Sequence, residues 1–108
     1  MNKRARACEF PRDVRRKIKA RDRDQCIFCV MLGNSGYPPA QIAHYIGRAQ
    51  NGLGIEENGA LVCVDHHQQL DNSPRRAAML NLFRGYLMGQ YSEWDESKLT
   101  YSKWGWTK

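Results

Sequence analysis

Cysteine and histidine side chains, which bind metals and move protons, are grouped at recurring spacings in this sequence. Cys26 and Cys29 are separated by two residues, and Cys63 and His66 repeat that spacing after an insert that contains a loop. Thiolate and imidazole groups at this spacing are typical halves of a tetrahedral zinc site. The four side chains therefore predict a structural Zn²⁺ ion. Two alternatives are a one-residue shift of the last ligand to His67 and a set of ordinary buried cysteines.

A second group of side chains remains after the zinc ligands are assigned. His44 lies in a short apolar segment, Asn58 follows a glycine-rich loop, and His67 ends the set. An imidazole with an unperturbed pKa near ~6.5 exchanges protons close to neutral pH, and it is also a common metal ligand. These three residues therefore predict a catalytic site. For His44, the alternative is a histidine that only packs in the core on a short strand.

Composition limits the size of the fold and the kind of partner. The chain has 108 residues, 42% of them hydrophobic, so we expect one domain with a small core that a bound metal would stabilise. The formal charge of +6 and the pI near 9.4 favour a polyanionic partner, although charge alone does not separate DNA from RNA or an anionic membrane. We expect no membrane span and no secretory signal, and therefore a reducing cytoplasm in which paired cysteines bind metal.

The elements that must position these residues begin with a basic N-terminal part. Residues 1–9 predict a poorly structured arm, in which Cys8 is isolated from any metal-binding pair. Residues 10–21 have helical periodicity, with Val14 and Ile18 as an apolar pair one turn apart. Seven cations lie in this helix and the turn after it: Arg12, Arg15, Arg16, Lys17, Lys19, Arg21 and Arg23. They form either a solvated surface or a surface that contacts phosphate.

Two short strands and a helix are predicted around the histidines. Residues 41–46 form the first strand candidate, with His44 on the same face as its isoleucines. Residues 60–62 form the second candidate and lead into the second zinc half-site. A helix should follow over residues 64–70, and the glycine-rich residues 47–54 should be an open loop.

A longer helix and a tail complete the predicted chain. Ser73 and Pro74 are typical of a helix start, and this helix should run to about residue 91. Four residues form its expected buried stripe: Met79, Leu82, Phe83 and Tyr86. Residues 92–108 carry all three tryptophans, and we expect this tail to pack back on the domain.

Linked motifs connect the zinc ligands with the candidate catalytic residues. They are, in order, Arg21-Asp22 before Cys26-x-x-Cys29, then Ala43-His44-Tyr45-Ile46-Gly47-Arg48, then Gly52-Leu53-Gly54-Ile55-Glu56-Glu57-Asn58, then Leu61-Val62-Cys63-x-x-His66-His67. Over residues 21–72 this arrangement closely resembles the HNH endonuclease family, in particular its small zinc-stapled members from phage and prophage genomes. Several motifs in the right order are more specific than any one of them.

The resemblance implies a fold and a role for each residue. The fold would be α+β, a ββα-metal (His-Me finger) domain with a structural zinc site, flanked by a basic helix and a C-terminal helix. One HNH nuclease domain would span residues 10–108, with its core at 21–72. His44 would be the general base, Asn58 would hold the hairpin loop through hydrogen bonds to the backbone, and His67 would be a ligand of the catalytic metal. These roles suit phosphodiester hydrolysis, which needs a deprotonated water and a cation at the scissile phosphate.

One position departs from the family pattern. Many members carry Asp or His immediately before the base as a second metal ligand, whereas this chain has Ala43, which binds no metal. Either another residue supplies that ligand or the activity is impaired. Asp71 lies one helical turn after His67 and is the candidate, with a helix-end or supporting role as the alternative. With so few protein ligands, the catalytic ion is expected to be weakly bound Mg²⁺ or Mn²⁺.

The predicted function is metal-dependent hydrolysis of double-stranded DNA with low sequence specificity. Arg48 directly follows the His44 strand and should meet the DNA backbone, with Arg16 and Lys19 extending this surface. A zinc-stapled DNA-binding module with an impaired nuclease site is the alternative, and a zinc-ribbon interaction protein would leave the basic charge unused. The family context implies the cytoplasm of a bacterial host, a phage or prophage gene, and phage packaging proteins as further partners.

Overall fold

A two-stranded hairpin lies at the centre of the computed structural model, which describes residues 2–33 and 38–102. Strand β1 (Gln41–His44) runs antiparallel to β2 (Gly59–Val62), so that His44 pairs with the first residue of β2. Both predicted strands are therefore present. The first ends at His44, two residues earlier than the sequence pattern indicated.

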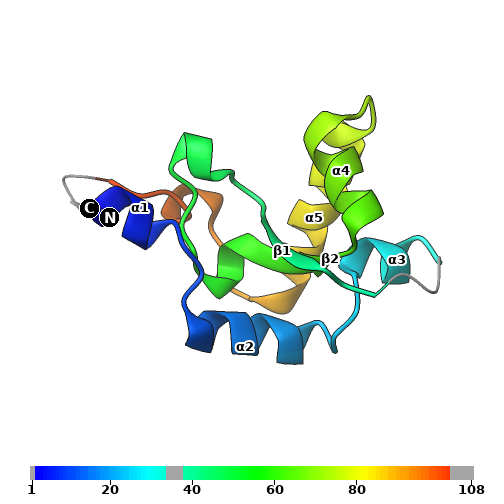
Figure 1. Ribbon diagram of the computed structural model, residues 1–108, viewed down its shortest axis with the longest axis horizontal. Coiled ribbons are helices and arrows are strands. Elements are labelled where there is room, and N and C mark those ends of the chain that lie inside the picture. The colour runs from blue at the N-terminus through cyan, green and yellow to red at the C-terminus, as the bar shows by residue number, and fades with distance from the viewer. Residues whose placement is uncertain (1, 34–37, 103–108) are drawn as a thin grey trace.

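Helices surround this hairpin and cover both of its faces (Figure 1). The bounds of the helices are α1 Lys3–Ala7, α2 Arg12–Arg21, α3 Ile27–Met31, α4 Val64–Asn72 and α5 Arg76–Gln90, and single 3-10 turns occupy Arg48–Gln50, Glu56–Asn58 and Glu96–Lys98. Helix α2 lies along one side of the hairpin, whereas α4 and α5 lie on the other side, and α3 lies near its open end. The order β1, β2, α4 gives the hairpin-then-helix arrangement that the sequence predicted.

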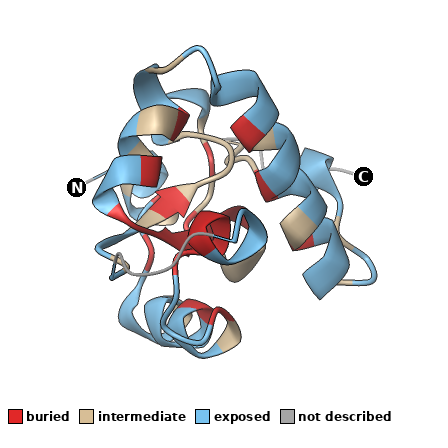
Figure 2. Cartoon of the chain, turned by 90° about the vertical axis from the view of Figure 1, so that its right-hand side faces the viewer, coloured by how far each residue is buried: buried red, intermediate tan, exposed pale blue. Residues whose placement is uncertain are grey.

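The alternation of side chains along each strand divides the core into two clusters. Ile42 and Leu61 face α2, where they pack with Phe10 and Ile18. Residues on the opposite face of the strands join a larger cluster with α3, α4 and α5. Its members are Cys26, Ile27, Phe28, Cys29, Ala43, Ala60, Val62, Cys63, Leu70, Met79, Phe83 and Leu87. Figure 2 shows these buried residues concentrated on the hairpin and on the inner sides of the helices. The hairpin is therefore held from both sides.

A buried charged pair fixes α2 to the hairpin. The Asp22 carboxylate accepts hydrogen bonds from the backbone N–H of Leu61 at 2.9 Å and from the Tyr86 hydroxyl. Arg21 donates to Asp22 at 2.7 Å and to the carbonyl of Gly59 at 2.6 Å. These bonds compensate the burial of the Asp22 charge, and they place the start of β2 relative to α2.

The N-terminal segment differs from the prediction of a poorly structured arm. Residues Lys3–Ala7 form helix α1, and the side chain of Asn2 caps it by accepting a hydrogen bond from the backbone N–H of Ala5 at 2.7 Å. The Ala7 carbonyl accepts a hydrogen bond from the backbone N–H of Gly54 at 2.9 Å. A Cβ atom at Gly54 would lie 2.0 Å from the Glu9 carbonyl oxygen, so only glycine permits this approach. Tertiary contacts, absent from the local sequence pattern, thus order this segment.

Helix α5 also differs from the prediction. It begins at Arg76, three residues after Ser73, which is the C-cap residue of α4. The Ser73 hydroxyl donates to the Gln69 carbonyl at 2.7 Å and accepts from the backbone N–H of Arg75 at 3.0 Å. Met79 and Phe83 are buried as expected and Tyr86 is partly buried, but Leu82 is 36% exposed, and Leu87 is the third fully buried residue. Successive helical residues are separated by about 100° around the axis, which directs Leu82 away from the face centred on Phe83.

The described part of the C-terminal tail packs back on the domain, as predicted. Leu99 is buried, and its carbonyl accepts a hydrogen bond from the Leu53 N–H at 2.8 Å. The indole N–H of Trp94 donates to the Glu57 carbonyl at 2.8 Å. The other two tryptophans, Trp104 and Trp106, lie outside the described residues.

Candidate functional site

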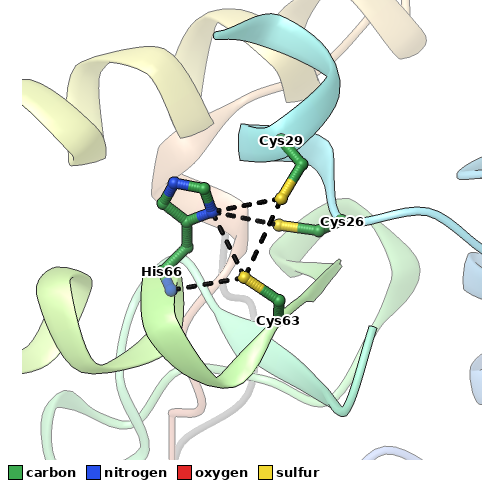
Figure 3. A group of neighbouring side chains, drawn as sticks. All are labelled: Cys26, Cys29, Cys63 and His66. Carbon is green, nitrogen blue, oxygen red and sulfur yellow. Dashed lines mark hydrogen bonds between the residues drawn. The ribbon is translucent and has the colours of Figure 1, made fainter. Parts of the chain in front are cut away.

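The four predicted zinc ligands come together at the junction of α3, β2 and α4. Cys26 and Cys63 are the N-cap residues of α3 and α4, and Cys29 and His66 lie in the first turns of those two helices. Figure 3 shows the three thiols converging on one nitrogen of the His66 ring. All four side chains belong to buried residues. Each two-residue spacing thus spans one helix start, which directs both side chains of a pair to the same point. We call these residues the Cys3His cluster.

The distances within the Cys3His cluster match the edges of a tetrahedron. The Nδ1 atom of His66 lies 3.6 Å from the sulfur of Cys26, 3.5 Å from that of Cys29 and 3.3 Å from that of Cys63. The sulfurs of Cys29 and Cys63 are 3.9 Å apart. Zinc bond lengths to sulfur and nitrogen in a tetrahedral site correspond to edges of about 3.6 Å between S and N and about 3.8 Å between two sulfurs. The cluster could therefore hold a structural zinc.

The chemistry of the thiols also favours a cation at this point. Burial, followed by the neighbouring thiols of Cys26 and Cys63, raises the pKa of Cys29 to about 12. A thiol with this pKa stays protonated at neutral pH unless a positive charge stabilises the thiolate. A divalent ion bound by all four ligands would supply that charge, and its binding would release protons.

His66 and His67 point in different directions from α4, because neighbouring helical residues are separated by about 100° around the axis. His66 is buried and belongs to the Cys3His cluster, whereas the side chain of His67 is 28% exposed. The structure thus favours His66 over the one-residue alternative for the fourth cluster position. His67 lies outside the Cys3His cluster and can therefore belong to the second group of residues.

His44 has one ring nitrogen engaged and one available. Its Nε2 atom lies 2.7 Å from the carbonyl oxygen of Cys8, which only accepts hydrogen bonds, so Nε2 carries the proton. The Phe10 ring packs against the imidazole with a centroid distance of 4.3 Å. The Nδ1 atom therefore has a lone pair that can accept a proton. Sequence spacing gave no sign of this contact, because Cys8 and His44 are 36 residues apart.

The surroundings of His44 favour its neutral form. Burial lowers its pKa below the ordinary value; the hydrogen bond to the Cys8 carbonyl opposes this effect, and the positive charges of Arg48 and Arg15 lower the pKa further. His44 is consequently uncharged at neutral pH, as a proton acceptor must be.

Asn58 is fully buried and ties the loop of the hairpin together. Its side-chain oxygen accepts from the N–H of Ile46 at 2.8 Å, and its amide donates to the carbonyls of Ile46 at 3.1 Å and Leu53 at 2.8 Å. The carbonyl of Asn58 accepts from the N–H of Tyr45, the residue after His44. This pattern is the side-chain-to-backbone arrangement that the resemblance implied for Asn58, and it fixes the backbone next to His44.

His67 and Asp71 form an exposed pair on α4. Their Nε2 and Oδ2 atoms are 3.6 Å apart, and the side chains are 28% and 58% exposed. An imidazole and a carboxylate are both ligands of divalent metals. Within residues 2–33 and 38–102, no further Cys, His, Asp or Glu side chain joins them in a cluster of three. The Ala43 side chain, at the position of the missing ligand, is buried.

Two adjoining cavities bring His44 and His67 to a common surface. They measure about 450 and 250 Å³, and both are lined by Ala43, His44, Arg48 and His67. We call these two cavities together the cleft. Asp71 lines its smaller part. A further cavity of about 480 Å³, near Trp94, is lined by no histidine or cysteine, so the cleft is the better candidate for chemistry.

The predicted DNA-binding cations separate into two groups. Arg48 lines both parts of the cleft, whereas Arg16 and Lys19 are exposed on α2 and line neither part. Arg15 and Arg76 line opposite parts of the cleft and were not singled out from the sequence. Arg15 was visible only as one of many basic residues in its helix, and Arg76 had no motif around it.

Taken together, these observations define a small α+β domain with an antiparallel hairpin and a buried Cys3His cluster consistent with a zinc site. None of the described helices is long and apolar enough to cross a membrane. Comparison with known proteins gives no match to a family model, to a curated protein or to a solved structure. The resemblance to HNH endonucleases therefore remains a prediction from the sequence motifs alone.

Proposed function

We propose that this protein is a metal-dependent endonuclease of the HNH type that hydrolyses phosphodiester bonds in double-stranded DNA. The observation that carries the proposal is the cleft, in which the neutral imidazole of His44 with an available ring nitrogen, the partly exposed His67-Asp71 pair and Arg48 share one surface. A binding module needs the arginine but has no use for the two histidines.

In this proposal His44 is the general base. Nδ1 accepts a proton from the attacking water, while Nε2–H remains bonded to the Cys8 carbonyl. That carbonyl fixes the tautomer, and it also stabilises the imidazolium that forms when Nδ1 takes the proton. Phe10 and the loop held by Asn58 keep the ring in place.

His67 and Asp71 would hold the catalytic ion, for which Mg²⁺ and Mn²⁺ are the best candidates. Their nitrogen and oxygen donors face the same part of the cleft as His44 and suit a labile divalent ion. Such an ion, when bound, would offset the negative charge that develops at the phosphate during hydrolysis. Arg48 would bind the same phosphate group from the strand side of the cleft.

Cleavage of supercoiled plasmid by the zinc-loaded protein tests this function. Incubation with Mg²⁺ or Mn²⁺ should convert the plasmid to nicked or linear forms, and omitting both ions while the structural zinc stays bound should stop the reaction. His44→Ala should lower the rate at least about 100-fold, because general base catalysis contributes on the order of 10² to 10⁴. Thermal unfolding and zinc content of the variant should match those of the parent protein.

Failure of every tested divalent ion to support cleavage, with the Cys3His cluster loaded, would overturn the proposal. Equal rates for the parent and His44→Ala would do the same for the role of His44. Asp71→Asn separates the two roles considered for that residue. If Asp71 is a metal ligand, Asp71→Asn should raise the Mn²⁺ concentration needed for half-maximal rate. If Asp71 only supports the helix end, that concentration should not change.

A zinc-stapled DNA-binding module is the second candidate. The observation that favours it is Ala43, which stands where many HNH proteins carry a second metal ligand, so that His67 is left with Asp71 as its candidate partner. Under this alternative the plasmid stays intact with each ion, while binding of duplex DNA persists and weakens steeply with salt. The same preparation therefore decides between the two functions.

A further inference from the structure

The residues that line the cleft follow one another in a definite order from one end to the other. Arg15 of α2 lines only the larger part and Arg76 of α5 lines only the smaller part, while His44, Arg48 and His67 line both. Helices α2 and α5 lie on opposite sides of the hairpin (Figure 1). The cleft therefore crosses the end of β1 from one helix to the other, with Arg15 at one end, Arg76 at the other end and the histidines between them.

Among residues 2–33 and 38–102, none of the three arginines of the cleft forms an ion pair. In the described ranges, 2–33 and 38–102, the arginines of ion pairs are Arg21 and Arg84, and neither lines the cleft. Glu9 and Asp71 are the acidic residues of the lining, and neither forms an ion pair with a cleft arginine. Three unpaired guanidinium groups along one groove form a row of positive charge, which favours an occupant with negative charges at regular intervals.

Arg15 is oriented before any ligand arrives. Its Nε atom donates a hydrogen bond to the Phe10 carbonyl at 3.0 Å, five residues earlier in the chain. This bond leaves the two terminal nitrogens of the guanidinium available. A planar group fixed in this way can donate to two oxygens of one phosphate, and little side-chain entropy is lost on binding.

We propose that the cleft holds one strand of DNA, and that Arg15 and Arg76 bind the phosphates on either side of the phosphate at His44 and Arg48. The inference deepens the proposed function, because the central phosphate is the one to be cleaved. The two outer arginines are positioning residues: they hold the strand along the cleft and do not touch the reacting atoms.

Binding of a fluorescein-labelled 20-base-pair DNA tests the inference independently of cleavage. Fluorescence anisotropy of the zinc-loaded His44→Ala protein, without added Mg²⁺ or Mn²⁺, would be compared for added Arg15→Gln and Arg76→Gln changes. Each should weaken binding about threefold to tenfold and reduce the slope of log K against log salt by about 1, as loss of one phosphate contact does. Arg15→Lys and Arg76→Lys should restore the slope because they keep the charge.

Neighbouring arginines outside the cleft supply matched controls. Arg12→Gln and Arg75→Gln each remove one exposed positive charge close in sequence to a cleft arginine, and neither residue lines the cleft. Their salt slopes should change by less than half as much. Equal effects for the cleft and control variants would overturn the inference, since they would show that binding follows total charge alone.

The inference and the proposed function fail in different ways. If the parent protein never cleaves plasmid but Arg15→Gln and Arg76→Gln still reduce the salt slope more than the controls, the strand path stands and the nuclease proposal falls. If the protein cleaves plasmid and the two variants bind as the controls do, the nuclease proposal stands and the strand path falls. Unfolding midpoints, measured beside each titration, identify any variant that has lost its fold.

Discussion

The two sides of helix α4 differ in how completely side chains of metal-binding types surround a point. On one side, His66 completes a buried Cys3His cluster in which every ligand faces the same centre. On the other side, His67 and Asp71 form a pair whose side chains are 28% and 58% exposed. A closed ligand set suits a metal that supports the fold, whereas an open one leaves room for water and substrate. Two adjacent histidines thus belong to sites with different chemical demands.

The largest expected effect comes from removing a ligand on the closed side. Cys29→Ser should abolish cooperative thermal unfolding near neutral pH, because structural zinc contributes on the order of 10 kcal/mol and a small domain has net stability of the same order or less. Circular dichroism and zinc content per chain would measure this, with chelation of the parent protein as the parallel treatment.

Cys8→Ser is the matched control for that substitution. Cys8 is also buried, but its thiol lies outside the Cys3His cluster. This variant should keep one zinc per chain and a cooperative transition. If Cys29→Ser bound zinc as tightly as the parent and unfolded at the same midpoint, the closed site would not be what holds the fold together.

An intermediate effect is expected from Asn58, which holds the loop of the hairpin next to His44. Asn58→Ala removes three hydrogen bonds and leaves backbone groups of Ile46 and Leu53 without partners. The free energy of unfolding should fall by about 2 to 4 kcal/mol, because buried polar groups that lose their hydrogen-bond partners destabilise the folded state. Urea unfolding of the zinc-loaded protein measures the difference. Asn81→Ala, at an exposed position of α5, should change stability by less than about 0.5 kcal/mol.

The smallest expected effect concerns the protonation of His44, which lines the cleft beside His67. Because the pKa of His44 is lowered, the neutral base should persist below the ordinary histidine pKa of about 6.5, and cleavage should decline only at still lower pH. Titration of the imidazole nitrogens by NMR would measure the pKa directly. Arg15→Gln removes a nearby positive charge and should raise the pKa of His44. A pKa at or above about 6.5 in the parent protein would contradict the described surroundings of His44.

Spacing along the chain was sufficient to predict the closed side. Two Cys/His pairs at the starts of helices need only a hairpin between them to meet, and the alternating apolar residues predicted that hairpin. The identity of the fourth ligand depended on a single residue of register in α4. Helical rotation decides it, because neighbouring residues are separated by about 100°.

The cleft and the residues that support it were predicted only in part. His44, Asn58 and His67 were identified as a group, but the partner of His44 was not, because the Cys8 carbonyl comes from a segment with no local signal of its contact. Arg15 and Arg76 reach the cleft from helices on opposite sides of the hairpin, so no motif contains both. Contacts between distant segments depend on packing, which periodicity does not encode. The exposed position of Leu82 illustrates the same limit within one helix.

The hydrogen bond between His44 and Cys8 has a consequence for how this domain tolerates mutation. The acceptor is a main-chain carbonyl, which every amino acid carries, so no exchange of the side chain at position 8 can delete it. Insertions and deletions before Phe10 act differently, because they move a different carbonyl, or none, to the imidazole. The register of the first ten residues should therefore be more strictly constrained than their identity.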